Sequence, residues 1–383
     1  MVLIYLICET LNSMGLQKVV SKKKSIVKVL VIQQKMIGDV LLSSLICKNL
    51  KLWNPNVQID FVANRQTLDV IRNNPYIDDL VIFEDHFKKD KWGLIQFLVK
   101  RRKKKYDYII DAYGKIESLL ICLLTPAVKK IGFRKIYSSW VYNELVDKIK
   151  YREGELQSSI KNRFQLLEPI MGDFPKNSDV EIQLTSEEIL ASRKKFDQEL
   201  GKGNQAIMVS ALGSNNNKTY PLNYLSQLLD LTFEITKLPL ILNYRPDQET
   251  KIDELIVQLK PSTQRAVIKS LTPKSLRDYM ASVYHCVAAV GNEGGALNIA
   301  KGLDKPTFAI FSPLIDPSGW HTEIHNRSMA VDVRSFFPNA IVYSDHRKTG
   351  KDPKKVTELY KMLKPELFKR KWIDFLKNCT NSF

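Results

Sequence analysis

Cysteines are few in this sequence, and they form none of the motifs that indicate a disulfide framework or a structural zinc site. The five cysteines are an odd set without a C-x-x-C pair: Cys8, Cys47, Cys122, Cys286 and Cys379. Such a set argues against both kinds of cross-link and fits a reducing cytoplasm. His321 and His325 follow a Pro-Ser-Gly stretch that indicates a loop, and no H-E-x-x-H motif occurs. We therefore expect no metal ion and no other cofactor.

Long apolar runs are also missing. The run from Val2 to Cys8 has only seven residues, lacks a basic region before it and is followed by Glu9. It is typical of neither a signal peptide nor a membrane span. We interpret the residues before Met14 as loosely attached, within an N-terminal extension that we place at residues 1–24.

Acidic residues are scarce relative to basic ones, 41 against 58, which leaves a formal net charge of +17. This charge favours an anionic partner, which can be nucleic acid, a membrane surface, or a phosphorylated or carboxylated substrate. Only the charge supports nucleic acid, because the sequence contains no helix-turn-helix, RNP-type or zinc motif. It has no Walker A motif, and the glycines between Gly201 and Ala206 precede their strand, so they cannot form a dinucleotide-binding turn.

Short β-branched runs alternate with segments of helical period in two series, a pattern typical of βαβ units and parallel sheets. In the first series we expect a helix over Val40 to Leu52 and strands at Val27 to Ile32, Val57–Val62, Asp79–Phe83 and Tyr108–Asp111. In the second series we expect a helix opening at Thr272 and Pro273, and strands at Ala206–Ala211, Leu238–Asn243, Ala266–Ile268, Cys286–Val290 and Thr307–Phe311.

The chain divides where this pattern breaks, between Phe174 and Gly203, and its 383 residues exceed what one core usually serves. Thr185 with Glu188 in this stretch predicts a capping box at the start of a polar helix. We expect Rossmann-like domains over residues 25–174 and 205–350, with a linker region over 175–204. A basic helix over 351–383 follows, and periodicity leaves open whether it crosses back to the first domain.

Ligands of open parallel sheets bind outside the carboxyl ends of the strands, so strand-to-helix loops are the places for chemistry. The first such loop, QQKMIGDV at residues 33–40, puts Asp39 at the start of a helix. Asp39 is either an N-cap that accepts hydrogen bonds from the first-turn amides or a carboxylate that faces the site.

Two loops of the second series have the composition of an anion site. In SALGSNNNKTYP, residues 210–221, Lys218 lies just before Pro221, which indicates a helix start. Helix N-terminal amides with one ammonium can bind phosphate, and the alternative is a solvated surface lysine. In AVGNEGGALNIAKGL, residues 289–303, Gly294 and Gly295 either approach a pyrophosphate or only turn the chain. Glu293 before them either bonds ribose hydroxyls or caps the helix.

Taken together, these loops resemble glycosyltransferase family 9, the bacterial heptosyltransferases of lipopolysaccharide core assembly, over Lys28 to Pro313. KVLVIQQKMIGDVLLSS resembles the family's first strand, Gly-Asp loop and first helix, and YDYIIDAYG a later strand of the same domain. LGSNNNKTYPLNYLSQLL resembles the Lys-x-Trp-Pro segment, with Tyr220 in place of Trp. GNEGGALNIAKGLDKPTFAIFSP resembles the C-terminal signature, usually Gly-Asn-Asp-Ser-Gly-Pro-Met-His followed by a Lys-Pro-Thr strand.

The resemblance implies an α/β fold of the GT-B type, in which two Rossmann-like parallel-sheet domains face a central cleft. It implies an inverting, metal-independent glycosyltransferase that moves a heptose or related sugar from a nucleotide-diphosphate donor, ADP-heptose first of all, to a lipopolysaccharide-core or related glycan acceptor. Such an enzyme would be cytoplasmic and peripheral on the inner membrane. The alternative is a catalytically weak relative that only binds a nucleotide sugar.

The resemblance also implies roles for single residues. Asp39 matches the general base and Lys218 the donor-phosphate lysine. Donor binding is implied for a further set: Thr219, Asp247, Glu293, Gly294, Gly295, Ala296 and Asn298. Four of these depart from the family pattern, because Glu293 replaces Asp, Gly294 replaces Ser or Thr, Ala296 replaces Pro and Asn298 replaces His. With these departures the loop can still bind a nucleotide sugar, but the sequence does not determine which sugar it is.

The segment KKDKWGLIQFLVKRRKKK, residues 88–105, combines apolar residues with a cationic end. A basic amphipathic segment can lie on an anionic membrane, and the alternative is a helix that buries its apolar face in the first domain. The implied acceptor is an anionic glycolipid. We expect acceptor-binding or membrane-facing contacts from Lys35, Gly38, Arg101, Arg102, Lys103 and Lys104, and no nucleic-acid partner.

Overall fold

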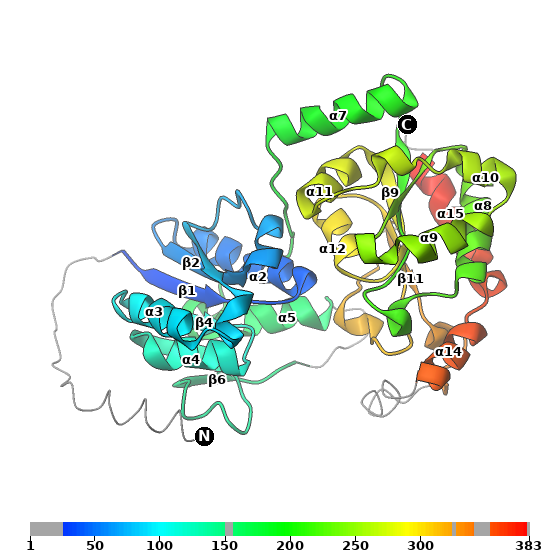
Figure 1. Cartoon of the computed structure of the whole chain (residues 1–383). Coiled ribbons are helices and arrows are strands. Elements are labelled where there is room, and N and C mark those ends of the chain that lie inside the picture. Colours follow the sequence, from blue (N-terminus) through cyan, green and yellow to red (C-terminus); the bar gives the residue numbers. More distant parts are fainter. Residues whose placement is uncertain (1–25, 150–155, 324–326, 341–352, 381–383) are drawn as a thin grey trace.

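The computed structural model describes residues 26–149, 156–323, 327–340 and 353–380 (Figure 1). The N-terminal extension expected over residues 1–24 lies outside this range, as do the residues that join the second domain to the C-terminal helices. Figure 1 shows two α/β lobes, connected by an extended segment that leads from α5 to α7.

The first sheet is parallel throughout, with the strand order β3-β2-β1-β4-β5-β6. Its strands are β1 (Lys28–Ile32), β2 (Gln58–Asn64), β3 (Asp79–Phe83), β4 (Tyr106–Asp111), β5 (Ala127–Phe133) and β6 (Glu144–Val146). The four strands predicted in this half are confirmed. β5 and β6 were not predicted, since β5 carries two adjacent lysines and β6 has only three residues.

Helices cover both faces of this sheet, because alternate side chains of each strand point to opposite faces. Val29 and Val31 pack with α2, whereas Leu30 and Ile32 pack with α3 and α4. The helices and 3-10 turns are α2 (Ile37–Trp53), η1 (Arg65–Val70), η2 (Asp85–Lys88), α3 (Lys91–Arg102), α4 (Ile116–Leu124), α5 (Ser158–Gln165) and α6 (Glu168–Met171).

The second sheet is also parallel, with the order β11-β10-β9-β7-β8. Its strands are β7 (Ala206–Ser210), β8 (Leu240–Asn243), β9 (Cys286–Asn292), β10 (Thr307–Ile310) and β11 (Ser328–Val331). The strand predicted at Ala266–Ile268 is wrong: Ala266 ends a helix, and Val267 forms only an isolated bridge with Leu240. The short β11 was not predicted.

The helices of this half include the predicted capping box, in which Thr185 and Glu188 bond each other's backbone amides. The helix start predicted at Thr272 is wrong, because the helix begins at Leu276 and Ser275 caps it. The elements are α7 (Ser186–Leu200), η3 (Asn216–Lys218), α8 (Leu222–Thr236), η4 (Pro246–Gln248), α9 (Glu249–Val257), α10 (Pro261–Ala266), η5 (Lys269–Leu271), α11 (Leu276–Tyr284), α12 (Gly295–Gly302), η6 (Pro317–Gly319), η7 (Val333–Ser335), α14 (Pro353–Met362) and α15 (Pro365–Thr380).

The C-terminal helices pack on the second domain and do not cross back to the first. Trp372 of α15 is fully buried, and its Nε1 donates to Thr232 Oγ1 of α8 at 3.0 Å. Its ring lies 4.7 Å from that of Phe308 in β10. Burial of aromatic side chains along α15 therefore completes the second core.

The linker is fastened to both domains. Lys48 of α2 donates to the Asp179 carbonyl at 2.9 Å, and Asn49 of α2 bonds the backbone of Asn177. A few residues later, the Ile182 amide donates to Gly302 of α12 at 3.1 Å. One buried apolar cluster includes residues of both sheets, so the two domains share packing as well as hydrogen bonds.

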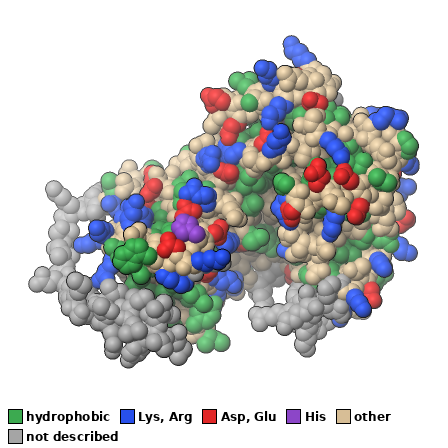
Figure 2. Space-filling model, viewed as in Figure 1, with side chains coloured by type: hydrophobic (Ala, Val, Ile, Leu, Met, Phe, Trp, Pro, Cys, Tyr) green, Lys and Arg blue, Asp and Glu red, His purple; other side chains and the backbone are tan. Residues whose placement is uncertain are grey.

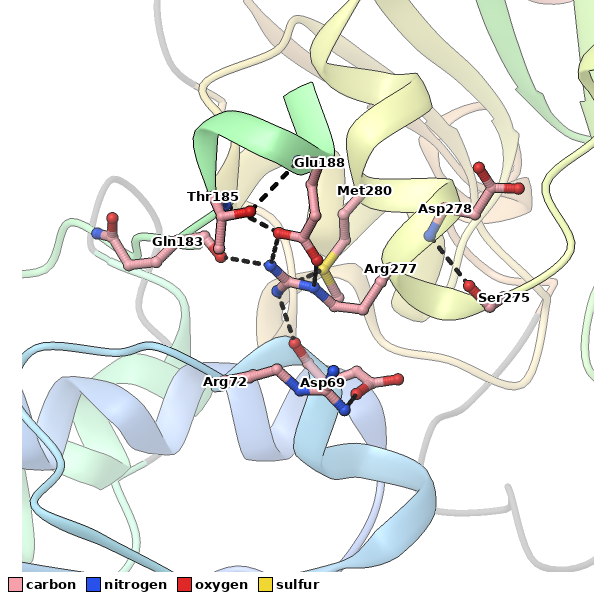
Figure 3. Close-up of polar contacts among 9 residues, drawn as sticks. All are labelled: Asp69, Arg72, Gln183, Thr185, Glu188, Ser275, Arg277, Asp278 and Met280. Atoms are coloured by element: carbon pink, nitrogen blue, oxygen red, sulfur yellow. Dashed lines mark hydrogen bonds and ion pairs between the residues drawn. The ribbon is translucent and has the colours of Figure 1, made fainter. Parts of the chain in front are cut away.

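Arg277 of α11 contacts the end of the linker, the adjoining helix α7 and, far away in the sequence, η1 of the first domain (Figure 3). Its Nε donates to Glu188 Oε1 of α7 at 2.7 Å, and its Nη2 donates to the Gln183 carbonyl of the linker at 2.9 Å. Its Nη1 donates to the Asp69 carbonyl of η1, in the first domain, at 3.0 Å. A guanidinium has five N–H groups in a fixed plane, so one side chain can hold all three segments.

Replacing Arg277 with Met should lower the free energy of unfolding by about 2 kcal/mol, because hydrogen bonds to and from charged groups are lost in a mostly buried position. Loss of the Asp69 contact should also widen the distribution of domain arrangements. Denaturant unfolding measures the first effect, and small-angle X-ray scattering measures the second as a larger radius of gyration. Arg72→Met, which removes an exposed arginine paired with Asp69, is the matched control. Unchanged stability and size would contradict this function of Arg277.

The pH dependence gives an independent check. Arg277 is the largest cause of a pKa of Glu188 below its ordinary value. A lowered folded-state pKa stabilises the fold above the unfolded pKa, about 4.3 for Glu. This stabilisation is lost as the pH falls through the lowered value. The difference between Arg277→Met and the parent should therefore shrink in acid.

Candidate active site

The candidate loops follow the central strands of both sheets. In the first sheet the chain order reverses between β1 and β4, and the loop with Asp39 follows β1. In the second sheet it reverses between β7 and β9, and the loops with Lys218 and Glu293 follow these two strands. Such switch points are where open α/β sheets bind ligands.

The two sets of loops contact each other across the domain interface. A Cβ atom on Gly38 would lie 2.9 Å from Asn298 Nδ2 and 3.4 Å from the ring of Trp320. A Cβ on Gly295 would lie 3.2 Å from Ile37. These glycines allow α2 of the first domain to approach α12 of the second at close range. The structure therefore brings the Gly-Asp loop and the Gly-Gly loop together at one place.

Asp39 lies in the first turn of α2 but does not cap it. The N-cap is Met36, which makes no side-chain hydrogen bond. The carboxylate of Asp39 instead accepts from Arg163 of α5, with Oδ1 and Nη2 separated by 2.7 Å. Within the described residues Oδ2 has no hydrogen-bond partner, and the side chain is 28% exposed. The carboxylate is thus held by one oxygen, the side chain is partly exposed, and the helix N-terminus favours its negative charge.

Basic groups surround this carboxylate on the side of the first domain. The pKa of Lys148 lies below its ordinary value, mainly because of desolvation and then because of the charges of Lys135 and Arg163, whereas Asp39 opposes the shift. The pKa of Tyr113, after β4, is raised by burial and by nearby carboxylates that include Asp39, and Lys35 opposes this effect. Such a surrounding favours an anionic ligand beside Asp39.

Lys218 lies in the second-domain loop between β7 and α8. Pro221, predicted as the first helical residue, is the N-cap of α8. Asn292 at the end of β9 holds this loop: its Nδ2 donates to the Ser210 and Ala211 carbonyls at 3.1 and 2.8 Å, and its Oδ1 accepts from the Tyr220 amide at 2.7 Å. The Tyr220 side chain is fully buried in the second core, so Tyr in place of the family's usual Trp affects the packing of this core.

Glu293 lies among cations at the start of the Gly-Gly loop. Burial raises its pKa, while the charges of Lys218 and Lys301 act in the opposite direction. Burial lowers the pKa of Lys301 of α12 to about 8, and Glu293 opposes this shift. Within the described residues, none of these three side chains has a hydrogen bond or ion pair. They therefore form a charged group whose hydrogen-bonding atoms are available to a ligand.

Two residues that were predicted to bind the sugar donor form hydrogen bonds within the protein. Thr219 Oγ1 accepts from the Gly213 amide at 3.1 Å and donates to the Asn215 carbonyl at 2.9 Å, so it closes the loop around Lys218. Both carboxylate oxygens of Asp247, after β8, accept from Arg245 at 2.9 Å. The pair lies beside the same loop, because Arg245 Nη1 is 3.5 Å from the Ser214 carbonyl.

Residues 101–104 are predicted to bind the acceptor or to face a membrane. These residues lie at the amino end of the first sheet, opposite Asp39. Arg101 is buried with Nη1 3.9 Å from Asp60 Oδ2, and Lys104 bonds Asp60 and Asp79 at 2.7 and 3.2 Å. Arg102 and Lys103 are exposed at the same end. By contrast, Lys35 pairs with Asp85 at 2.8 Å in the loop that precedes Asp39.

Several residues of the site were not among the candidates predicted from the sequence. Arg163 comes from a stretch without recognisable pattern, and Lys301 lies inside the Gly-Gly segment but seven residues after Gly294. Asn292 lies inside the resembling signature, where a polar residue ending a buried strand could have been noticed. His321 lies in a loop, as expected, and burial is the main cause of a pKa of about 3, so its ring is neutral. His325 lies outside the described residues.

Neither a metal cluster nor a membrane span is found in the described parts of the chain. No group of three or more His, Cys, Asp or Glu side chains is placed to hold a metal ion there. No helix among these residues is both long enough and apolar enough to cross a bilayer.

Known proteins resemble the chain in sequence and in structure. A model of glycosyltransferase family 9 (heptosyltransferase) matches residues 96–331. Lipopolysaccharide heptosyltransferase 1 of Campylobacter coli is 22% identical over 294 residues, which are 74% of this chain and 83% of the relative. Lipooligosaccharide heptosyltransferase 2 of Haemophilus influenzae is 21% identical over 294 residues, with the same shares.

Two solved structures show the fold. A family 9 glycosyltransferase from Veillonella parvula has a TM-score of 0.75 at 14% identity and covers 94% of this chain and 99% of its own. The ADP-heptose lipopolysaccharide heptosyltransferase II of E. coli has a TM-score of 0.63 at 17% identity, with 79% and 90% covered. The architecture is therefore the GT-B type, with two Rossmann-like domains. Because the family model matches more than half of its residues, this chain belongs to glycosyltransferase family 9, the heptosyltransferases, and is a glycosyltransferase.

Proposed function

We propose that the protein transfers a heptose or a related sugar from a nucleotide-diphosphate donor, ADP-heptose first of all, to an anionic lipopolysaccharide-core acceptor, with inversion at the anomeric carbon. The observation that carries this proposal is the contact of the Gly-Asp loop with the Gly-Gly loop across the interface. This contact supports a site in which Asp39, with one oxygen unpaired among the described residues, serves the acceptor while the start of α12 serves the donor diphosphate. The family match begins after Asp39, so the role of this residue rests on geometry.

The first part of the mechanism uses Asp39 as general base. The acceptor hydroxyl gives its proton to Oδ2 while its oxygen forms a bond to the anomeric carbon of the donor sugar. Arg163 holds the carboxylate by Oδ1, so Arg163 is a positioning residue. The cations around Asp39, Lys148 and Lys135 among them, provide binding for acidic groups of the acceptor.

The second part concerns the leaving group. As the bond between the anomeric carbon and the phosphate oxygen breaks, the electron pair stays with the nucleoside diphosphate, which gains negative charge. Lys218 and the first amides of α12 supply positive charge at this position, so a protein cation does the work that a metal ion does in other transferases. Glu293 and Asn298 would then contact the donor beside these groups. Contact between the domains excludes water, which would otherwise hydrolyse the donor.

A donor screen with purified protein tests this function. Nucleoside diphosphate release is measured with ADP-, UDP- and GDP-sugars, each with and without a delipidated lipopolysaccharide-core acceptor. We expect acceptor-dependent release from ADP-heptose. A protein that is stabilised against heat by a nucleoside diphosphate but never releases it from any donor would be a binding relative without activity, and the proposal would fail.

A further inference from the structure

Lys301 and His321 are two polar residues beside the candidate active site that the proposed mechanism does not use. Most basic side chains of the chain lie at the surface, and Figure 2 shows them spread over both domains among Asp and Glu. Lys301 differs from these, because its side chain is only partly exposed and makes no hydrogen bond or ion pair with the described residues. Both ring nitrogens of His321 are buried, also without a hydrogen-bond partner there. Unpaired polar groups of this kind are rare in folded proteins and call for a partner.

Lys301 shares a face of α12 with Asn298, which contacts the first domain. A Cβ atom on Gly38 of α2 would lie 2.9 Å from Asn298 Nδ2. Lys301 follows Asn298 by three residues, a spacing that puts both side chains on one side of a helix. Long helical side chains point back towards the helix N-terminus, so the ammonium extends towards the Gly-Gly loop. In agreement with this direction, burial raises the pKa of Glu293 at that loop, and the charges of Lys218 and Lys301 oppose the rise.

His321 reaches the same place from the loop that follows β10. Its two neighbours in the sequence contact the first domain: the ring of Trp320 lies against the Gly-Asp loop, and Thr322 Oγ1 accepts from the Gln157 amide at 3.0 Å. Burial and then the charge of Lys301 lower the pKa of His321, so the two side chains lie near each other. The ring is therefore neutral and has one nitrogen that can accept a hydrogen bond from an ammonium.

Glu293 and Lys301 together favour hydroxyl groups as ligands. They have opposite charges, but no ion pair joins them within the described residues. Their charged atoms are not among the fully buried ones, so a ligand can reach both. A hydroxyl can donate to the carboxylate and accept from the ammonium at the same time, whereas a phosphate would be repelled by the carboxylate. This pair therefore fits a polyhydroxylated ligand better than an anionic one.

The proposed mechanism puts such a ligand at this point. The anomeric carbon of the donor sugar must lie between the acceptor hydroxyl at Asp39 and the diphosphate at Lys218. Both α12 and the loop after β10 contact the Gly-Asp loop, so side chains from these two elements border the sugar. Lys301 comes from the first element and His321 from the second.

We propose that Lys301 binds a hydroxyl group of the donor sugar together with Glu293, and that His321 is a positioning residue that orients the Lys301 ammonium, an assignment that rests on the proposed function. The ammonium has three N–H groups, so it can donate to the hydroxyl and to the neutral imidazole at once. Lys301 and His321 then contribute to the choice of the sugar, which the motifs of the sequence leave undetermined.

Calorimetric titration with ADP-heptose and with ADP, both without acceptor, separates sugar contacts from nucleotide contacts. Lys301→Met keeps the length of the side chain but lacks the ammonium. Its affinity for ADP-heptose should fall about tenfold or more, the usual effect of losing a hydrogen bond from a charged group, and its affinity for ADP should not change. His321→Phe should weaken ADP-heptose binding in the parent but not in the Lys301→Met background, because His321 acts through Lys301. Lys301→Arg should recover part of the loss.

Stability provides a readout that distinguishes these roles from structural ones. Replacing an unpaired buried polar group with an apolar one is neutral or stabilising, so Lys301→Met and His321→Phe should unfold at the same or a higher denaturant concentration than the parent. The matched control is Lys305→Met. Lys305 is another partly buried lysine whose pKa is lowered, mainly by burial, but it precedes β10 and lies at the opposite edge of the sheet. Its replacement should leave both affinities unchanged.

Equal affinity of Lys301→Met and the parent for ADP-heptose would overturn the sugar contact. An equal loss of affinity for ADP would also overturn it, because Lys301 would then bind the diphosphate. Independent effects of the two substitutions, or a loss of stability in His321→Phe, would overturn the positioning role of His321. The proposed function is tested separately by acceptor-dependent release of nucleoside diphosphate. If the parent releases none but binds ADP-heptose more tightly than ADP, the proposed function fails and the titrations still decide the sugar contact.

Discussion

Asp39→Asn should lower turnover by about 10²- to 10⁴-fold, the usual contribution of a general base, with little change in nucleoside diphosphate affinity. Asn keeps the shape of the side chain and can still contact Arg163, but it cannot accept the proton of the acceptor hydroxyl. Stopped-time assays of nucleoside diphosphate release measure the first quantity, and calorimetric titration with ADP measures the second.

A control variant separates the base from a structural role. Asp147→Asn removes another carboxylate of the first domain that pairs with an arginine, Arg134, and should leave turnover unchanged. Turnover within a few-fold of the parent would leave Asp39 as a partner of Arg163 only.

Lys218→Ala should weaken donor binding and also lower turnover, by about 10²- to 10³-fold, because this ammonium contacts the diphosphate before and during bond cleavage. Lys218→Arg should recover part of the loss, since it restores a positive charge. Removal of Lys218 also takes away a charge that lowers the pKa of Glu293. That pKa should rise, so any step that needs ionised Glu293 should fail at a higher pH than in the parent.

The matched control is Lys202→Ala. Lys202 is an exposed lysine at the end of the linker region, just before β7, so it lies at the opposite edge of the second sheet. Both donor affinity and turnover should be unchanged in this variant. If Lys218→Ala behaved like Lys202→Ala in both measurements, Lys218 would be a solvated surface lysine and the donor phosphate would have to bind elsewhere.

Most of the strands could be predicted because their signal is local. The central strands of both sheets are short runs of β-branched residues buried on both faces, and the adjacent helices have their own period. The strands that were missed lie near the sheet edges, where shorter length or polar residues weaken this signal: β5, β6 and β11. The false strand at Ala266–Ile268 shows the reverse error, since a short apolar run also fits the end of a helix.

The roles of single side chains were harder to predict from the sequence than the positions of the strands. The sequence did not show that Asp39 leaves the cap of α2 to Met36 and pairs with Arg163, which lies 124 residues away in the sequence. In α3, periodicity marked the apolar residues but did not show that Leu98 faces the core while Trp92 faces solvent. The charges of residues 101–104 suggested one basic patch, whereas Asp60 and Asp79 bind part of it.

The sequence by itself determined the α/β class and the division of the βαβ units into two domains. It also determined the three loops that carry the Gly-Asp, Lys and Gly-Gly motifs. Each of these features depends on neighbouring residues and on backbone propensity. Only the tertiary structure decided which of these loops meet, because Gly38 and Asn298 are brought together by the packing of two separate sheets. It also decided that Arg277 holds both domains and that the C-terminal helices stay on the second. Long-range contacts of this kind depend on shape and burial across the whole chain, and no local pattern records them.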